Sequence, residues 1–401
     1  MEVKAGYKQT DSGIIPNDWE CRKLNELAGY VNGKAQEGSI KDSGKYVVVN
    51  SKFIASDGEV KKYSDVCLCE AKVGDVLMVL SDVPNGRAIA KCFLVNEKDK
   101  YSVNQRICLL SPRGIDGRLL FYKLNRNPHF ISFDDGVKQT NLRKQDVLNC
   151  PIGFPQSQAE QQAIANALSD ADALIESLEQ LIEKKRQIKQ GVMQELLTGK
   201  RRLPGFSGEW ESRSLGEIAQ IQRGASPRPI ESPIWFDDKS QIGWVRISDI
   251  TKAGMFLKET TQRLSAKGVA NSRPVQKDRL IMSICATVGR PIITEIDVCI
   301  HDGFVVFENL RADKKFVYYV LKQIEPDWAK HGQTGSQMNL NTGLINQTRF
   351  LHPPIDEQCS IGNFLFDLDS ELLCLEERRT KSEKIKQAMM QELLTGKVRL
   401  V

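Results

Sequence analysis

The chain carries one stretch of sequence twice. Residues 188–203 read IKQGVMQELLTGKRRL and residues 385–400 read IKQAMMQELLTGKVRL, so that 13 of 16 positions are identical at an offset of 197 residues. This offset is nearly half of the 401-residue chain, which predicts a tandem of two similar units. Two similar surfaces suit a bipartite or pseudo-symmetric ligand, and DNA is the commonest ligand of that kind.

The repeated segments predict two long helices. Pro155 and Pro354 precede them, and Gly199 and Gly396 follow them. Each helix then spans about 40 residues, or ~60 Å at 1.5 Å per residue. Steps of three and four residues between apolar positions are typical of a coiled-coil seam. The seam residues that we expect to pair the helices or to dock other subunits are Ile164, Leu168, Ile175, Leu178, Ile361, Leu365, Leu372 and Leu375.

An amphipathic helix of this length needs a partner to cover its apolar stripe. The simplest partner is its own copy, and we expect the two helices to pair antiparallel because a globular block separates them. The alternative is that each stripe packs on its own globular domain.

The blocks between the helices are predicted to be mixed α+β domains. Short β-rich runs are punctuated by Gly, Pro, Asn and Asp, and they occur at 45–50, 76–80, 92–95 and 107–110, then at 244–247, 280–284, 291–294 and 304–307. Residues 117–125 and 314–324 are predicted helices. The predicted order is a first domain at 1–154, a long helix at 155–200, a second domain at 201–353 and a second long helix at 354–401.

Composition narrows the class of protein. The formal net charge of +5 resides in the two globular blocks, whereas the repeated helical segments are net acidic, and mildly basic blocks are compatible with phosphate contacts. No apolar run has membrane-spanning length, and the N-terminal residues lack an apolar signal core, so we expect a cytoplasmic protein. The ten cysteines show no framework or metal-binding spacing, which favours free thiols.

The sequence matches none of three common catalytic motifs in full. The series Asp65…Glu70-Ala71-Lys72 loosely fits a nuclease pattern, but it does not recur in the second block. The sequence from His352 to Ile355 has the wrong neighbours for an adenine methyltransferase, and prolines that open a helix explain it. There is no phosphate-binding loop of the GxxxxGK[ST] type, and the four histidines lack metal-ligand spacing.

The chain resembles the specificity subunit of type I restriction–modification systems along its whole length. The segments that carry the resemblance are PNDW and GEWESRSLGEIA, GDVLMVLSDVPNGRAIA and DRLIMSICATVGRPII, the Asn-Leu steps before each proline, and the QELLTGK helix ends. The resemblance implies two target-recognition domains that each read one half of a split DNA site. It also implies long helices that set the spacing and dock two modification subunits, which methylate adenine, with motor–nuclease subunits joining them.

In that family the specificity chain catalyses nothing. The resemblance therefore implies no cofactor for this chain, because S-adenosylmethionine and ATP with Mg²⁺ would bind the partner subunits. Half-sites read from one face of DNA lie about one helical turn apart, ~34 Å, and longer helices should lengthen the spacer.

Base edges are read by Arg, Lys, Asn and Gln, and phosphates by Lys, Arg and backbone amides. By position in the repeat, the candidate DNA-contacting residues of the first block are Lys34, Arg87, Asn104, Gln105, Arg106, Lys138, Gln139 and Asn141. Those of the second block are Arg223, Ser226, Arg228, Arg290, His301, Gln333, Ser336, Gln337 and Asn339. For each, a solvated surface side chain is the alternative, and the glycine before Arg87 and Arg290 is compatible with a shared structural turn.

We therefore predict a DNA-recognition and assembly subunit. The alternatives are a coiled-coil scaffold whose basic domains bind proteins, and an enzyme with an unrecognised nuclease centre. Dependence of DNA methylation on this chain separates the first two, and metal-dependent cleavage by the chain alone would support the third.

Overall fold

The computed structural model describes residues 5–83, 86–331 and 340–400, with the backbone alone for 329–331. The chain forms two compact units, each of which combines separate stretches of sequence. Unit 1 contains residues 1–179 and 378–401, and unit 2 contains residues 180–377. The linear domain boundaries given above remain a prediction. No helix in the described ranges is both long enough and apolar enough to span a membrane.

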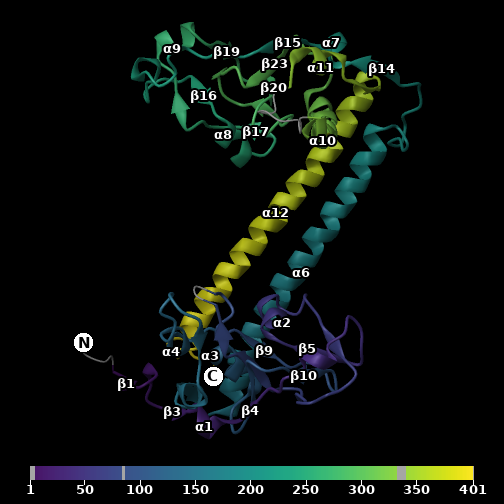
Figure 1. Ribbon diagram of the computed structural model, residues 1–401. Coiled ribbons are helices and arrows are strands. Elements are labelled where there is room, and N and C mark those ends of the chain that lie inside the picture. Colours follow the sequence, from purple (N-terminus) through teal and green to yellow (C-terminus); the bar gives the residue numbers. More distant parts are fainter. Residues whose placement is uncertain (1–4, 84–85, 332–339, 401) are drawn as a thin grey trace. The chain divides into compact units, whose positions relative to one another are not determined.

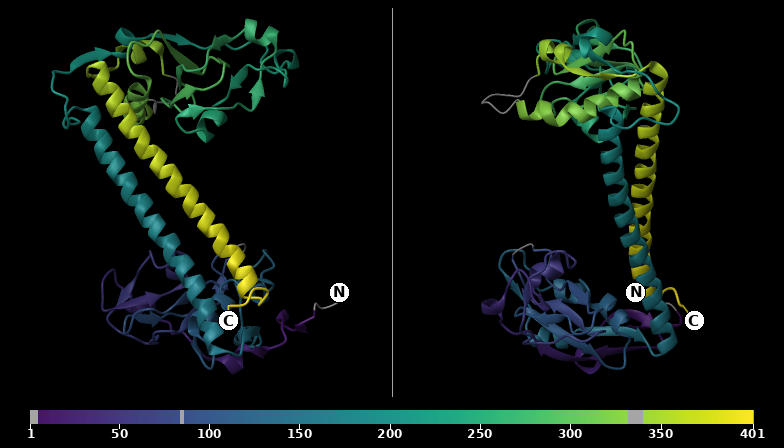
Figure 2. Two further views of the ribbon diagram at one scale, coloured as in Figure 1. Left: turned by 180° about the vertical axis from the view of Figure 1, so that it is seen from behind. Right: turned by 90° about the vertical axis from the view of Figure 1, so that its right-hand side faces the viewer.

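Two long helices pass from one unit into the other. They are α6 (Gln158–Leu197) and α12 (Ile355–Leu393), which lie side by side in both views of Figure 2. Ion pairs between them show that they run antiparallel: Lys386 pairs with Asp172 in unit 1, and Lys185 pairs with Glu371 in unit 2. The predicted helix pair is confirmed.

Both helices end in the same way. Gly199 and Gly396 follow the last helical turns and have φ angles of +67° and +70°, a left-handed conformation that glycine adopts without steric cost. A Cβ atom on Gly396 would stand 2.5 Å from the Pro16 ring, and one on Gly199 would stand 3.3 Å from the Trp210 ring. Glycine therefore both ends each helix and lets it approach the domain closely.

Unit 1 contains a four-stranded sheet in the order β4-β11-β7-β9, a three-stranded sheet in the order β10-β5-β6, and three strand pairs (Figure 1). The strands are β1 (Tyr7–Thr10), β2 (Gly13–Pro16), β3 (Trp19–Lys23), β4 (Ala28–Asn32), β5 (Tyr46–Val49), β6 (Tyr63–Ser64), β7 (Val76–Val79), β8 (Ser81–Asp82), β9 (Cys92–Leu94), β10 (Tyr101–Val103), β11 (Ile107–Pro112), β12 (Thr140–Asn141) and β13 (Pro151–Pro155). The helices are α1 (Leu24–Leu27), α2 (Ser51–Ala55), α3 (Gly117–Leu124), α4 (Pro128–Ile131) and α5 (Lys144–Leu148), with the 3₁₀ turn η1 (Glu37–Ser39).

Unit 2 has the same two sheets, each with one further strand at its edge. They are a five-stranded sheet, β15-β23-β20-β21-β17, and a four-stranded sheet, β18-β16-β22-β19. The strands are β14 (Glu211–Ser214), β15 (Gln220–Arg223), β16 (Gly243–Val245), β17 (Phe256–Leu257), β18 (Gln262–Arg263), β19 (Arg273–Val275), β20 (Leu280–Ser283), β21 (Pro291–Thr294), β22 (Val298–Ile300), β23 (Phe304–Glu308) and β24 (Arg349–His352). The helices are α7 (Leu215–Ile218), α8 (Ile247–Lys252), α9 (Ala266–Ala270), α10 (Lys314–His331) and α11 (Thr342–Gln347), with the 3₁₀ turn η2 (Pro233–Trp235).

The central strands show why the main sheets are buried on both faces. Successive side chains of a strand point to opposite faces. In β7, Val76 and Met78 join the core that contains the long helices, whereas Leu77 and Val79 join the core beneath the smaller sheet. Because both faces are covered, the sequence of this strand reads as an unbroken apolar run.

A buried ion pair attaches each long helix to the opposite end of its partner. In unit 2, Arg202 binds both oxygens of Glu357 at 2.5 Å, and the Glu357 side chain is fully buried. In unit 1, Arg399 binds Glu160 and the more exposed Asp18. The two pairs stand at the same offset of 197 residues, so the chain returns to its own first domain through its C-terminal segment.

Two predicted elements differ from the observed ones. The predicted strand at 244–247 ends at Val245, and Ile247 begins α8, because Asp249 accepts the backbone N–H of Arg246 and caps a helix there. The helix predicted at 314–324 continues to His331 and contains Pro326.

Candidate nucleic-acid interface

In unit 1, most of the predicted DNA-contacting residues gather at one edge of the main sheet. The chain leaves β4 through Lys34 and enters β11 through Gln105 and Arg106, and the antiparallel pairing of these strands brings the two turns together. The Gln105 N–H donates to the Lys34 carbonyl at 3.2 Å, and the Leu80 N–H donates to the Arg106 carbonyl at 2.8 Å. The three predicted side chains are exposed on this edge.

Glu37 lies at the centre of this group. Its carboxylate accepts hydrogen bonds from the amides of Gln105 at 2.6 Å and Asn104 at 3.3 Å. Asn104 itself is buried, whereas Gln105 remains exposed. Glu37 therefore holds Gln105 in a defined orientation at the surface, which is what a base-reading amide requires.

A second group joins the same edge through the strand pair β8 and β12. Asn141 pairs with Ser81, and the Gln139 amide donates to the Ser81 hydroxyl at 2.7 Å. The Asp82 carboxylate accepts backbone N–H groups of the loop that carries Arg87, including that of Ala88 at 2.6 Å. The exposed side chains of Arg87, Gln139 and Asn141 are thus attached to the end of β7, beside the first group.

In unit 2, the corresponding edge is organised around Asp302. Its side chain accepts the Ser226 hydroxyl at 2.6 Å and the Arg228 guanidinium at 3.3 Å, and its carbonyl accepts Arg223 Nε at 2.6 Å. The neighbouring His301 ring lies 3.7 Å from the same carboxylate. The structure therefore brings together the four predicted residues of this edge through one residue, Asp302, that the sequence analysis did not single out.

The charges in this cluster follow from its contacts. The Ser226 hydrogen bond, aided by the charge of Arg228, holds the pKa of Asp302 below its ordinary value, so that Asp302 is ionised at neutral pH. Burial lowers the pKa of His301, which keeps its ring neutral, and its Nδ1 accepts the Gly303 N–H at 2.9 Å. The two arginines therefore supply the positive charge at this edge.

One glycine in each unit makes the edge possible. A Cβ atom on Gly33 would stand 2.0 Å from the Asn104 carbonyl oxygen, and one on Gly224 would stand 2.0 Å from the His301 carbonyl oxygen. Only glycine tolerates such an approach. Because Gly33 and Gly224 make the same close approach, the residues that they meet, Asn104 and His301, occupy equivalent positions in the two units.

Arg87 and Arg290 do not occupy equivalent positions. The Arg290 carbonyl accepts the Ser283 N–H at 3.0 Å, and in unit 1 it is the Lys91 carbonyl that accepts the equivalent Val79 N–H at 3.0 Å. The glycine–arginine steps therefore belong to loops of different length. The structural counterpart of Arg290 is Lys91.

The other predicted contacts are placed less directly. Lys138 is exposed, and its backbone N–H donates to Asp135 at 3.0 Å, but among the described residues no side-chain contact attaches it to the edge. Gln333, Ser336, Gln337 and Asn339 lie outside the described residues. Whether any of the predicted residues touches DNA stays a prediction.

The seam residues divide between two environments. Ile164 and Leu168 belong to the unit 1 core together with Leu393 of the opposite helix, and Ile361 and Leu365 belong to the unit 2 core. Both expected modes of packing, on the partner helix and on the domain, therefore occur together. Further along the helices, Leu178 and Leu372 are buried, whereas Ile175 and Leu375 are half-buried.

Sequence reasoning missed the carboxylates Glu37 and Asp302 because it searched for cations and amides. Asp302 follows the predicted His301 directly, and this position was the available signal. The pairing of Arg202 with Glu357 was also missed, although both residues recur at the repeat offset as Arg399 and Glu160.

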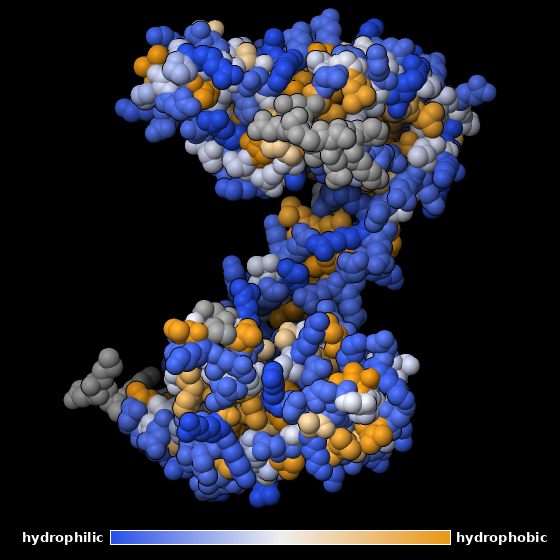
Figure 3. Space-filling model, viewed as in Figure 1, coloured by the Kyte–Doolittle hydropathy of each residue, from blue (hydrophilic) through white to orange (hydrophobic). Residues whose placement is uncertain are grey.

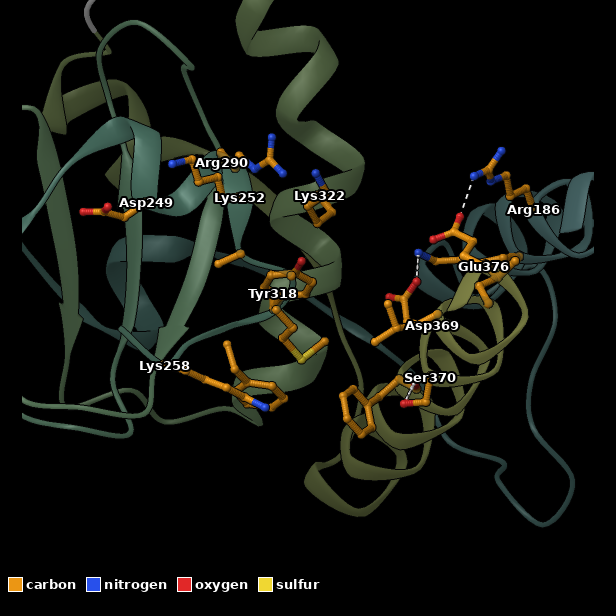
Figure 4. A pocket seen from close by; sticks show the side chains of 18 of the residues that line it. Arg186, Asp249, Lys252, Lys258, Arg290, Tyr318, Lys322, Asp369, Ser370 and Glu376 are labelled. Atoms are coloured by element: carbon orange, nitrogen blue, oxygen red, sulfur yellow. Dashed lines mark hydrogen bonds and ion pairs between the residues drawn. The ribbon is translucent and has the colours of Figure 1, made fainter. Parts of the chain in front are cut away.

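Unit 2 also contains a cavity of about 1110 Å³. It lies between the start of β17, the helix α10 and the paired long helices, and most of its charged lining residues are labelled in Figure 4. Apolar side chains, among them Met255, Tyr318 and Phe366, form much of its wall. In the described ranges, no group of three or more His, Cys, Asp or Glu side chains is arranged to hold a metal ion.

The comparisons with known proteins agree on the family. A family model described as the type I restriction modification DNA specificity domain matches residues 16–188 and again 207–387. The putative type I restriction enzyme MjaX specificity subunit of Methanocaldococcus jannaschii is 24% identical, with 98% of this chain and 97% of the relative covered. The MjaVIII specificity subunit of the same organism is also 24% identical and is covered to 96%.

The fold is shared with solved structures. The S subunit of a type I restriction-modification system from M. genitalium superposes with a TM-score of 0.64 at 18% identity, covering 98% of each chain. A chain from a study of complex assembly in the type I R-M system gives a TM-score of 0.56 at 16% identity, covering 96% of this chain and 99% of that one. Each matched segment of our chain carries one of the two sheet edges described above, and the chain belongs to the type I restriction modification DNA specificity family.

Proposed function

We propose that the chain is the sequence-recognition subunit of a type I restriction–modification complex and that each sheet edge reads one half of a bipartite DNA target. The observation that carries the proposal is the repetition of the edge. Equivalent strand ends in the two units present different exposed side chains, Gln105 and Arg106 in one and Arg223 and Arg228 in the other. A shared scaffold with different side chains suits two readers of different sequences.

The long helices offer a surface for other subunits. Leu174, Leu181 and Ile188 stand seven residues apart on α6 and are 41%, 39% and 43% exposed. Apolar surface is visible on the long helices in Figure 3. A heptad stripe left open on a helix favours a further helix packed against it. We propose that it docks modification subunits, two per chain, and that motor–nuclease subunits join this assembly.

In this proposal the chain itself is not catalytic. Adenine methylation with S-adenosylmethionine and the work driven by ATP with Mg²⁺ belong to the partner subunits. The role of the chain is to place them on DNA, and no cofactor is assigned to it.

Copurification tests the docking. The variant Leu181→Lys with Ile188→Lys should lose a coexpressed modification subunit, because each lysine places a charge in the apolar contact. The control is Leu344→Lys, at a residue that is 41% exposed and belongs to α11 instead of the α6 stripe. Equal recovery of the modification subunit with both variants would reject the docking surface.

The scaffold alternative makes a different prediction. A scaffold would retain its partner subunits, yet DNA methylation would not depend on the identity of either sheet edge. Exchange of residues 1–154 for those of a relative should replace one half of the methylated motif and leave the other half unchanged.

A further inference from the structure

The edge that carries the predicted readout residues in unit 2 continues into the cavity. β20 ends at Ser283, β21 starts directly after Arg290, and β17 runs parallel to β21 with Phe256 opposite Ile293. Lys252 is the last residue of α8, and the short turn that follows it leads into β17, on the same edge as Arg290. Beyond it the cavity extends to α10, which contributes Lys322.

Four carboxylates line this cavity, and among the described residues all except Glu259 hold contacts within the chain. Asp249 accepts the hydroxyl of Thr261 at 2.9 Å, and Asp369 accepts the Tyr319 hydroxyl at 2.7 Å and pairs with Lys189. Glu376 pairs with Arg186 at 2.5 Å. These contacts neutralise two of the six basic residues that line the cavity.

Three of the four remaining cations, Lys252, Lys258 and Arg290, form no ion pair with the described residues. Lys322 pairs with Glu325 at 2.6 Å, whereas neither Lys252 nor Arg290 has a carboxylate within ion-pair distance in the described part of the chain. Figure 4 shows both on the side of the cavity formed by the sheet, with Lys322 on the adjacent helix. Uncompensated cations in a partly enclosed site attract an anion more strongly than cations on an open surface.

In unit 1, the cation at the position equivalent to Arg290 is paired within the chain. Lys91, the counterpart of Arg290, donates to Asp57 at 2.8 Å and to the Ala55 carbonyl at 3.0 Å. The charge of Lys91 is compensated within the chain, whereas Arg290 has no carboxylate partner among the described residues. The difference argues against a purely structural role for the cation at this strand end.

We propose that Lys252 and Arg290, at the mouth of this cavity, bind the phosphodiester backbone of DNA next to the second half-site. The inference rests on the function proposed above, and it adds a contact that carries no base information. Phosphate contacts of this kind fix the register of a protein on DNA without specifying sequence. An acidic segment of a partner protein is the competing occupant.

The salt dependence of DNA binding by the full chain tests the proposal. The probe is a fluorescent duplex that contains the methylated motif, and its dissociation constant is measured between 50 and 200 mM KCl. The double variant Arg290→Gln with Lys252→Gln should lower the slope of log Kd against log salt by about 1.8, at about 0.9 per phosphate lost. The methylated motif should not change.

Lys277→Gln is the matched control, because Lys277 is exposed at the opposite end of β20 and lies outside the cavity lining. It should leave the slope unchanged. If the double variant keeps the wild-type slope while the wild type yields a bipartite motif, the phosphate site is wrong and the proposed function stands. If the double variant keeps the wild-type slope but no longer copurifies with a partner protein, the cavity binds an acidic segment of that partner. Absence of a bipartite motif with the wild-type chain would instead refute the proposed function.

Discussion

Replacement of Arg202 by methionine should destabilise unit 2 far more than a surface mutation. Arg202 is the bidentate partner of Glu357, whose side chain is fully buried, and Trp210 supplies the third hydrogen bond to it at 3.1 Å. Removal of one partner of a buried ion pair costs about 3–5 kcal/mol, because the remaining charge is left without compensation. Since Trp210 still donates to one oxygen, we expect the lower end of this range, about 3 kcal/mol.

Equilibrium unfolding in urea, followed by tryptophan fluorescence, measures the effect. With a slope of about 3 kcal/mol per M, the midpoint of the unit 2 transition should fall by about 1 M. The double variant Arg202→Met with Glu357→Met should recover most of the loss, because apolar residues of similar size often replace a buried pair at little cost. By contrast, Lys185→Met breaks a partly exposed pair and should cost no more than ~1 kcal/mol.

A loss below about 1 kcal/mol for Arg202→Met, or a double variant no more stable than the single one, would refute this reasoning. The carboxylate of Glu357 would then not depend on Arg202 for its compensation.

Three further predictions follow from the same contacts. Asp302→Asn should relax or change only the half-motif read by unit 2, because it removes the charge that holds Arg228 and Ser226; methylome mapping checks this against the unchanged other half, and alteration of both halves would contradict it. Burial lowers the pKa of Lys123 from 10.5 to about 7. Between these two pH values the unfolded chain holds a proton that the folded chain has released, so the free energy of unfolding increases with pH. The cost of burying Lys123 is therefore absent above pH 10.5 and grows as the pH falls towards 7. Lys123→Met supplies an apolar side chain at the position where unit 2 has Val320, 197 residues later. It should flatten this dependence in thermal unfolding of unit 1, and an unchanged pH slope would count against the prediction. Insertion of seven residues into both α6 and α12 keeps the phase of the seam and adds about 10 Å, which should lengthen the DNA spacer by about 3 base pairs, whereas an unchanged spacer would show that the helices do not set it.

Much of the fold can be predicted from the sequence because the chain contains an internal repeat. The offset of 197 residues that relates the two QELLTGK segments also relates Arg202 to Arg399 and Glu357 to Glu160, so a local repeat predicts a tertiary one. Continuous apolar runs such as 76–79 identify central strands, since both faces of the sheet are covered. The strand predicted to reach Ile247 was wrong because a capping carboxylate three residues after Arg246 outweighed the apolar pattern.

The organisation of the site was harder to predict. Candidate residues were chosen by type, and the structure places most of those that it describes at one sheet edge of each unit. The carboxylates that hold them come from distant positions in the sequence. The Gly-Arg steps at Arg87 and Arg290 looked equivalent in sequence, although their loops differ in length and Lys91 is the true counterpart. A single sequence shows neither the equivalence of Lys91 and Arg290 nor the lack of a carboxylate beside Arg290 among the described residues.

The central claim is that two sheet edges on one chain read the two halves of a split DNA target. The most direct test is to express the chain with an adenine-modification subunit in a methylation-free host and to map N6-methyladenine by single-molecule sequencing. The account predicts a bipartite motif with a fixed unspecified gap that disappears when this chain is omitted. A demonstrably assembled complex that gives no motif, or a motif that persists without this chain, would contradict it.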